Sequence, residues 1–357
     1  QLVVTLDCPD RPGIVHAITA GIVAAGGNIT ELQQFSSPDS GHFFTRIEVD
    51  GSESDELTRA IAETTAGFDA RLRVDDAQRP TRTLILASKA GHALNDLLFR
   101  WQGGDLPIDV VGIMANHDVL SPMAEFYRVP FTSRAVTAET KAAFEDEVRR
   151  AVEERDVELV VLARYMQILS PELCAFLAGR AINIHHSFLP GFKGANPYRQ
   201  AHTRGVKLIG ATAHFVTSDL DEGPIIEQNV VRVDHTMEVP KLVRKGQAQE
   251  SQTLAEAVRL FAEHRVLADV PDEQVTHTAA MLLMLVHTLS VERHLAPEDL
   301  TVDDVRDMTG AGDAFNAGFL SSYLSNEGDL VASCLAGHAL SARVLACPGA
   351  NEPPFEP

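Results

Sequence analysis

The sequence has few basic residues. Its 357 residues include 30 Lys and Arg against 50 Asp and Glu, which gives a formal net charge of −20 at pH 7. A nucleic-acid surface needs clustered Lys and Arg to meet phosphates, so this balance argues against a nucleic-acid partner. The shortage is greatest from Ala268 onward, where 14 acidic residues face three basic ones and no lysine. Residues 267–357 are therefore expected to form a separate, acidic tail.

Cysteines and long apolar runs are scarce as well. The four cysteines show no CxxC spacing, and a chain of this size can bury a core without disulfides, so we expect reduced thiols in a cytoplasmic protein. No apolar run approaches the ~20 residues that span a membrane, so no membrane partner is expected. Apolar residues still make up 45% of the chain, and its length suggests two or three domains.

The first 75 residues follow a β-α-β-β-α-β pattern. The turn DCPDRPG at 7–13 leads into a helix with apolar residues at helical spacing, which Gly26 and Gly27 end. A second helix is expected over 55–66. The expected strands are 2–6, 28–36, 42–49 and 70–74. This is the order of a ferredoxin-like domain.

The turn DRPGIV at 10–15 and the segment GGNI at 26–29 make this domain resemble the ACT family. That resemblance implies a regulatory module that pairs with a copy of itself, giving a homo-oligomer, and binds an amino acid such as glycine or methionine. The implied effector-binding residues are Asp10, Gly13 and Asn28. The alternative is that the glycines only form a tight turn and a helix end, in a module that serves as a dimer contact.

A polar linker with a proline, 76–82, precedes a second domain at 83–266. Its strands alternate with helices and are apolar throughout, which predicts an α/β fold with a mostly parallel, Rossmann-like sheet covered on both faces. Helices are expected over HALNDLLFRW at 92–101 and over 138–154, and a long amphipathic helix from Val239 to about His264 closes the domain. The expected strands are 83–88, 107–116, 158–166, 181–186, 206–217 and 224–233.

The segment NIHHSFLPGFKG at 183–194 begins within one of these strands, near its carboxyl end, where ligands bind in such sheets. Asn183 and His185 are two residues apart, so their side chains share one side of the sheet, while His186 faces the other. Asp221, in the loop SDLDEG, could return to the same strand end. An amide and an imidazole can stabilise an oxyanion, and a carboxylate can orient a water or hold the charge of the histidine, so this set suits acyl chemistry.

Two other interpretations of these residues stay open. A single Asn or His at a strand end is often a hydrogen-bonded structural residue. A zinc site would need three convergent ligands, for which His185, His186 and His214 are conceivable. Adjacent strand residues point to opposite faces, which disfavours the zinc site.

NIHHSFLPGFKG followed by HFVTSDLDEGPI at 214–225 resembles the folate-dependent formyltransferases in both motifs and in their separation. The resemblance implies catalytic roles for Asn183, His185 and Asp221. ARYMQILSP at 163–171 is similar to the segment that lines the pterin pocket, although many relatives have Arg where Gln167 stands. The implied substrate-binding residues are Met166, Ile168, Leu169, His214, Ser218, Leu220 and Gly223.

The formyl acceptor distinguishes the enzymes of this fold. Transferases that act on glycinamide ribonucleotide carry a glycine-rich phosphate loop after the first strand, whereas SKAGHALNDLLFR at 88–100 has one glycine at that turn. With the ACT-like domain ahead of it, the stretch 1–266 resembles the formyltetrahydrofolate deformylases. That resemblance implies hydrolysis of 10-formyltetrahydrofolate to tetrahydrofolate and formate in one-carbon and purine metabolism, with no cofactor and no metal. The alternatives are formyl transfer to an amine and a catalytically disabled amino-acid sensor.

The tail contains VRDMTGAGDAFNAGFL at 305–320, which resembles the C-terminal signature of ribokinase-type (pfkB) sugar kinases. In that family the backbone corresponding to Gly310–Gly312 holds phosphate charge and the residue at Asp313 is the base, while Met308 replaces the usual Thr. Such kinases need roughly two to three hundred residues. The tail has about ninety, so sugar kinase activity is the least favoured function, and an orphan fragment is expected.

Overall fold

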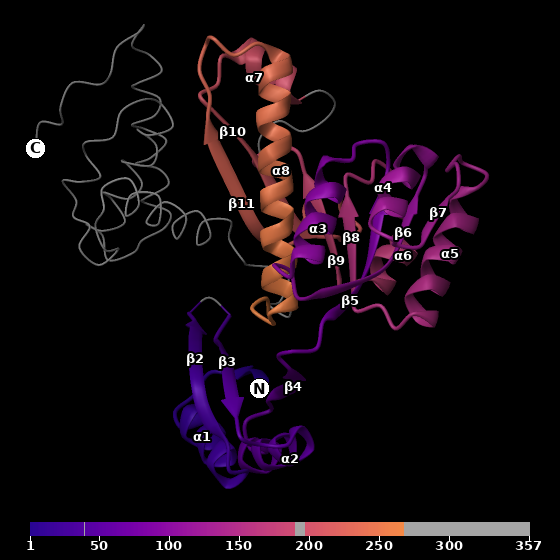
Figure 1. Ribbon diagram of the computed structural model, residues 1–357. Coiled ribbons are helices and arrows are strands. Elements are labelled where there is room, and N and C mark those ends of the chain that lie inside the picture. The colour runs from indigo at the N-terminus through magenta and orange to yellow at the C-terminus, as the bar shows by residue number, and fades with distance from the viewer. Residues whose placement is uncertain (39, 190–196, 268–357) are drawn as a thin grey trace, which may run out of the picture. The chain divides into compact units, whose positions relative to one another are not determined.

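The computed structural model describes residues 1–38, 40–189 and 197–267, which lie in one unit, Gln1–Val270 (Figure 1). Two sheets account for the strands of this part of the chain. The expectations for the tail, including its kinase-like signature, lie outside the described residues.

The first sheet is antiparallel, in the order β2-β3-β1-β4. Its strands and two helices follow the predicted β-α-β-β-α-β order. Their bounds are β1 Leu2–Pro9, α1 Ile14–Ala24, β2 Asn28–Ser37, β3 His42–Asp50, α2 Ser54–Thr65 and β4 Arg71–Asp76. Ile18 and Ile22 of α1 and Ile61 of α2 are buried in the core beneath the sheet. Gly13 caps α1 with a left-handed backbone, φ 101°, a conformation that favours glycine.

The second sheet contains seven strands among the described residues, in the order β11-β10-β9-β8-β5-β6-β7. Strands β5 to β9 pair in parallel, and β10 runs antiparallel to both β9 and β11, so the predicted mostly parallel sheet is confirmed. The bounds are β5 Thr81–Ala87, β6 Ile108–Ala115, β7 Phe131–Ser133, β8 Leu159–Ala163, β9 Ala181–His185, β10 Leu208–Phe215 and β11 Ile225–Arg232. Because β4 ends at Asp76 and β5 begins at Thr81, strands occupy both ends of the segment expected as a linker.

Helices cover both faces of this sheet, as Figure 1 shows for α3 and α8 on one face and α5 and α6 on the other. Their bounds are α3 His92–Gly103, α4 Ser121–Phe126, α5 Lys141–Glu154, α6 Pro171–Phe176, α7 Pro197–Arg204 and α8 Val239–Ala262, with a 3-10 turn at Asp118–Leu120. The sequence predicts α3, α5 and α8. It misses α4, α6 and α7, because helices of six to eight residues are too short to show a helical period.

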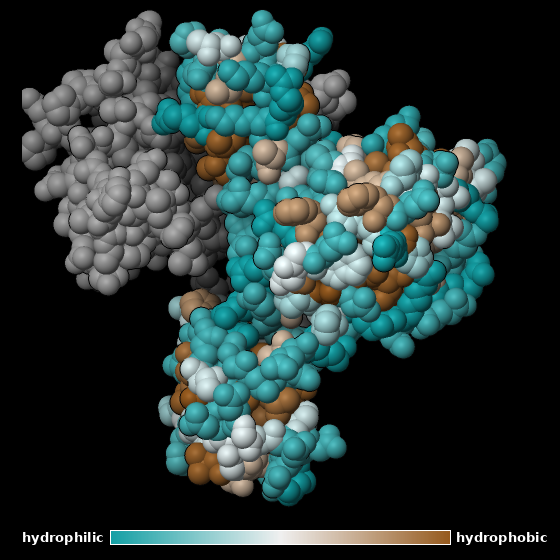
Figure 2. Space-filling model, viewed as in Figure 1, coloured by the Kyte–Doolittle hydropathy of each residue, from teal (hydrophilic) through white to brown (hydrophobic). Residues whose placement is uncertain are grey.

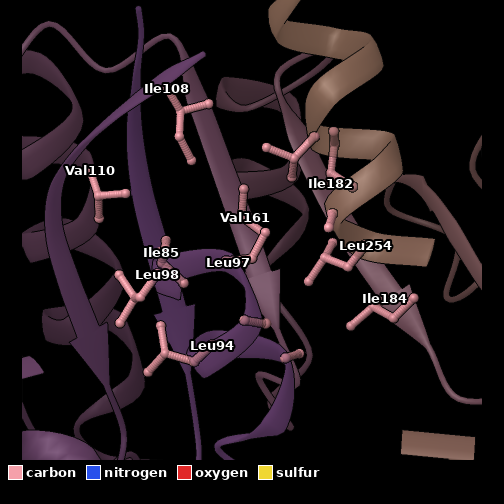
Figure 3. Packing of buried hydrophobic residues seen from close by; sticks show 14 of the residues in the cluster. Ile85, Leu94, Leu97, Leu98, Ile108, Val110, Val161, Ile182, Ile184 and Leu254 are labelled. Carbon is pink, nitrogen blue, oxygen red and sulfur yellow. The ribbon is translucent and has the colours of Figure 1, made fainter. Parts of the chain in front are cut away.

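The central strands are buried on both faces. In β5, Leu84 and Leu86 pack toward α5 and α6, while Ile85 packs toward α3 and α8. Figure 3 shows leucines of α3 and Leu254 of α8 against apolar residues of β5, β8 and β9. The molecular surface in Figure 2 is largely hydrophilic, with hydrophobic residues in scattered groups. No helix among the described residues is long and apolar enough to cross a membrane.

The parallel register aligns the strand ends that matter for function. Ala87 of β5 lies opposite Ala163 of β8, and Leu162 of β8 lies opposite Asn183 of β9. The carboxyl ends of these three strands therefore meet at one edge of the sheet, where α/β proteins of this kind bind ligands.

Candidate active site

Strands β9 and β10 bring the predicted catalytic residues to this edge. Asn183 and His185 lie two residues apart near the end of β9. Strand β10 runs in the opposite direction beside them, with His214 opposite Asn183. The imidazoles of His185 and His214 are both buried.

Asp221 completes the group from the loop between β10 and β11. Its Oδ2 lies 3.2 Å from Nδ1 of His185, and its Oδ1 lies 3.6 Å from Nε2 of His214. The backbone at Asp221 is left-handed, with φ 59°, which Asp and Asn tolerate better than most residues. The structure thus brings together the amide, the imidazole and the carboxylate that the sequence suggests.

Gly223 determines how closely the loop returns to β10. A Cβ atom at this position would lie 1.9 Å from the carbonyl oxygen of Phe215. The amide of Phe215 donates a hydrogen bond of 2.8 Å to the carbonyl of Pro224, which closes the loop. Because Gly223 has no side chain, the backbone of the loop can approach the backbone at the end of β10.

The hydrogen bonds of His214 fix the orientation of the Asn183 amide. Nδ1 of His214 lies 2.8 Å from the carbonyl oxygen of Phe215, which can only accept, so this nitrogen carries the proton. In the neutral ring Nε2 is then an acceptor, and it lies 3.2 Å from Nδ2 of Asn183. One amide N–H of Asn183 points to His214, and the second stays available to a ligand.

The two histidines also determine the charge of Asp221. The hydrogen bond from His185, with the ring of His214 beside the same carboxylate, holds the pKa of Asp221 well below its usual range, although burial opposes this shift. Asp221 is therefore a carboxylate at neutral pH. With Nδ1 of His185 facing this carboxylate, Nε2 is the ring atom left for a substrate, and it is buried with no hydrogen-bond partner among the described residues.

His186 does not join this group, as its position on the strand predicts. Its ring centroid lies 5.0 Å from that of His185 and 6.4 Å from that of Tyr198. Burial, together with the positive charges of Arg164 and His185, lowers the pKa of His186 to about 4, so the ring is neutral. Within residues 1–38, 40–189 and 197–267, no three His, Cys, Asp or Glu side chains are placed to hold a metal ion.

The predicted pterin-pocket residues divide into two kinds. Met166 and Ile168, which follow β8, are exposed apolar side chains, with exposed fractions of 58% and 63%. Leu220 and Ser218, in the Asp221 loop, are exposed as well. Leu169 instead packs in the core between the sheet and α5, so its contact with a folate stays a prediction.

A buried polar cluster around Glu250 is the feature that the sequence analysis missed. Glu250 of α8 is 1% exposed. Its Oε1 accepts a 2.5 Å hydrogen bond from Tyr198, and its Oε2 lies 2.7 Å from Nε2 of His92 and 3.3 Å from Nε of Arg164. Burial alone would raise the pKa of Glu250, but these three partners outweigh it and lower the pKa, so Glu250 is a carboxylate.

The members of this cluster come from α3, the end of β8, α7 and α8, which are far apart in sequence. The sequence contains one signal of this buried cluster. Glu250 falls on the apolar face of α8, four residues after Gly246 and four residues before Leu254, both of which are buried. A charged residue at such a position predicts a buried partner.

The predicted effector residues of the first domain are all exposed. Gly13 caps α1, Asn28 begins β2, and the amide of Asp10 donates a 2.8 Å hydrogen bond to the carbonyl of Gly41. Their accessibility is compatible with a ligand, and their role stays a prediction.

Comparison with known families finds a match in three separate stretches of the chain. Residues 2–64 match the ACT domain, 81–258 match the formyl transferase family, and 288–356 match the pfkB family of carbohydrate kinases. The last match lies within the tail.

Individual proteins match across both described domains. A formyltetrahydrofolate deformylase of Corynebacterium sp. (strain P-1) is 46% identical over 268 residues, which cover 74% of this chain and 94% of that protein. The deformylase of Bacillus subtilis (strain 168) is 42% identical, with coverages of 73% and 89%. The crystal structure of the deformylase of Burkholderia mallei superposes with a TM-score of 0.72 at 48% identity, covering 74% of this chain and 95% of that one. The chain belongs to the formyltetrahydrofolate deformylase family.

Proposed function

We propose that this protein hydrolyses 10-formyltetrahydrofolate to tetrahydrofolate and formate, with water as the formyl acceptor and without a cofactor. The observation that carries the proposal is the convergence of Asn183, His185 and Asp221, joined by His214, at the carboxyl end of β9. Family membership supports the same reaction. We further propose that the enzyme acts in the cytoplasm, in one-carbon metabolism.

In the proposed mechanism, a water oriented by Asp221 adds to the formyl carbon. The developing oxyanion accepts hydrogen bonds from the free N–H of Asn183 and from Nε2 of protonated His185, whose positive charge the adjacent Asp221 carboxylate holds. The bond between the carbon and N10 then breaks. N10 takes one proton of the water through the His185–Asp221 pair, and formic acid releases the other to solution as formate leaves.

The folate would bind along the segment that follows β8. The exposed side chains of Met166 and Ile168, with Leu220 from the opposite loop, offer an apolar wall to the pterin ring. A hydrogen bond of 2.9 Å from the amide of Met166 to Oγ of Ser88 ties this segment to the end of β5. Ser218, Gly223 and His214 would complete the substrate-binding set, as the family resemblance implies, together with Leu169.

The first domain would regulate this reaction by binding an amino acid such as glycine or methionine. Strand β2 is an edge strand that exposes Leu32 and Phe35, which supports pairing with a second copy in a homo-oligomer. A path for coupling also exists. The residues after α8 contact β3, where Nε of Arg46 donates a 3.0 Å hydrogen bond to the carbonyl of Glu263.

The decisive experiment supplies 10-formyltetrahydrofolate and no acceptor, in water enriched in oxygen-18. We expect equal amounts of tetrahydrofolate and formate, with one labelled oxygen in each new formate. Turnover that requires an added amine would assign the protein to formyl transfer. No turnover in either case would leave an amino-acid sensor as the better description.

A further inference from the structure

The hairpin of β10 and β11 projects past the catalytic strand at the ligand-binding edge. Strand β10 runs antiparallel to β9, and its Thr212 lies opposite His185, the last residue of β9. The four residues of β10 before Thr212 therefore extend roughly 13 Å beyond the end of β9, at about 3.3 Å per residue. The end of β11 accompanies them, with Arg232 opposite Leu208. This projecting part of the hairpin borders the edge at which the substrate reacts.

Helix α7 and the first turns of α8 pack on the projecting hairpin. Tyr198 of α7 and Leu242 of α8 are buried together with Ile209 of β10, and Figure 1 shows these elements gathered at one end of the domain. The ring centroid of Tyr198 lies 6.4 Å from that of His186, which lies 5.0 Å from that of His185. Two successive ring contacts therefore connect α7 with the catalytic histidine.

The exposed side chains at this end of the domain are mostly basic. Residues 197–208 and 230–246 contain seven Lys and Arg against two acidic residues, in a chain whose net charge is −20. We call six of these exposed side chains the basic rim: Arg199, Arg204, Lys207, Arg232, Lys241 and Arg244. The local charge is therefore opposite in sign to that of the whole chain, which attracts an anionic ligand to this end.

Lys241 and Arg244 stand where the helix itself disfavours them. Both lie in the first two turns of α8, and the first turn contains no acidic residue. The N-terminal end of a helix carries a partial positive charge, so acidic residues stabilise it and basic residues do not. The two side chains and the helix end therefore add their positive charges, an arrangement that favours an anionic ligand outside the helix.

We propose that the basic rim binds the glutamyl tail of the folate substrate and gives the enzyme a preference for folates that carry several γ-linked glutamates. The inference rests on the proposed hydrolysis, because that reaction brings a folate to this edge. The tail is the anionic end of the folate, and each further glutamate adds one carboxylate. Arginine and lysine bind carboxylates through charge-assisted hydrogen bonds.

The order of the strands gives the tail its direction. The apolar residues proposed to hold the pterin, Met166 and Ile168, follow β8 on one side of β9, and β10 lies on the other side. N10 joins the pterin half of the folate to the benzoyl-glutamyl half. With the formyl group at His185 and the pterin beside β8, the benzoyl-glutamyl half extends toward β10 and the basic rim.

The test compares KM for tail-free 10-formyltetrahydropteroate and for 10-formyltetrahydrofolate with one and with five glutamates. Exposed ion pairs are individually weak, so the four added carboxylates should together lower KM by about tenfold, and high salt should reduce this gain. The double variant Lys207→Glu with Arg244→Glu should remove the gain, while kcat and KM for the tail-free substrate stay unchanged. Arg150→Glu, an equally exposed site on α5, is the matched control and should keep the gain.

Three results would overturn the inference. The first is an equal KM for one and five glutamates in the unaltered protein, and the second is a gain that persists in the double variant. The third is an equal loss of the gain in Arg150→Glu, because net charge rather than the basic rim would then be responsible. Turnover of the tail-free substrate tests the hydrolysis separately. If that turnover is absent, titration calorimetry with tetrahydrofolate carrying one or five glutamates still decides whether the basic rim binds the tail.

Discussion

Substitution of Asp221 by Asn is the sharpest test of the active site. The change removes one charge and keeps the size of the side chain. Asn also tolerates the left-handed backbone, φ 59°, that position 221 adopts, so the loop should keep its shape. Any effect can then be assigned to the lost carboxylate.

The expected magnitude follows from the contact with His185. A unit charge 3.2 Å from the imidazole interacts with its positive charge by about 5 kcal/mol at an effective dielectric constant of ~20. Part of that energy is already offset by the burial of the carboxylate. We therefore expect kcat to fall at least ~100-fold, equivalent to about 2.7 kcal/mol, with KM for the folate little changed.

Release of tetrahydrofolate and formate without an acceptor is the assay. Asp219→Asn is the matched control, because Asp219 is an exposed aspartate in the same loop, and it should keep full activity. If Asp221→Asn retains activity near that of the unaltered protein, Asp221 has no part in the mechanism.

Three further expectations follow from the same structure. The folded state depresses the pKa of Asp221, so the carboxylate contributes stability above the unfolded pKa of ~3.9, and this contribution is lost as the pH falls through the folded pKa. Denaturant unfolding should therefore show that the difference in the free energy of unfolding between Asp221→Asn and the unaltered protein shrinks below about pH 4. Gly223→Ala places a Cβ 1.9 Å from a carbonyl oxygen, so it should lower the free energy of unfolding by about 1–3 kcal/mol and abolish activity. Gly67→Ala is the control: its Cβ would have no atom within 4 Å, so stability and activity should both be unchanged. Ile168→Ser should raise KM for the folate about tenfold at unchanged kcat, because the pterin would lose an apolar contact, while Phe99→Ser, an equally exposed position of α3, should leave KM unchanged. An unaltered KM for Ile168→Ser would remove this segment from the folate pocket.

Long periodic segments and the strand that carries Asn183 and His185 could be predicted from the sequence. Helices α1, α5 and α8 repeat their apolar residues over three or more turns, and the apolar strands β5 and β8 are bounded by polar turns. Short elements such as β7, with three residues, and α6, with six, could not be predicted, because their backbone is held by neighbours rather than by a local pattern.

Leu169 and Glu250 illustrate the same limit for the site. Leu169 lies in the segment assigned to the pterin pocket, yet its side chain packs in the core, since adjacent residues of an irregular segment face different ways. Glu250 looks like one more charge on a long helix. Only the packing of α8 on the sheet reveals that His92, Arg164 and Tyr198 surround it.

The sequence by itself determined the order of the elements, the shared side of Asn183 and His185, and the family, because periodicity and motif spacing are local properties of the chain. The tertiary structure decided how those pieces act together. It placed Asp221 against His185, fixed the Asn183 amide through His214, and set the basic rim beyond the end of the catalytic strand. These contacts join strand ends and loops that are distant in sequence, and their distances depend on the register of the sheet and the packing of α8, which no local pattern encodes.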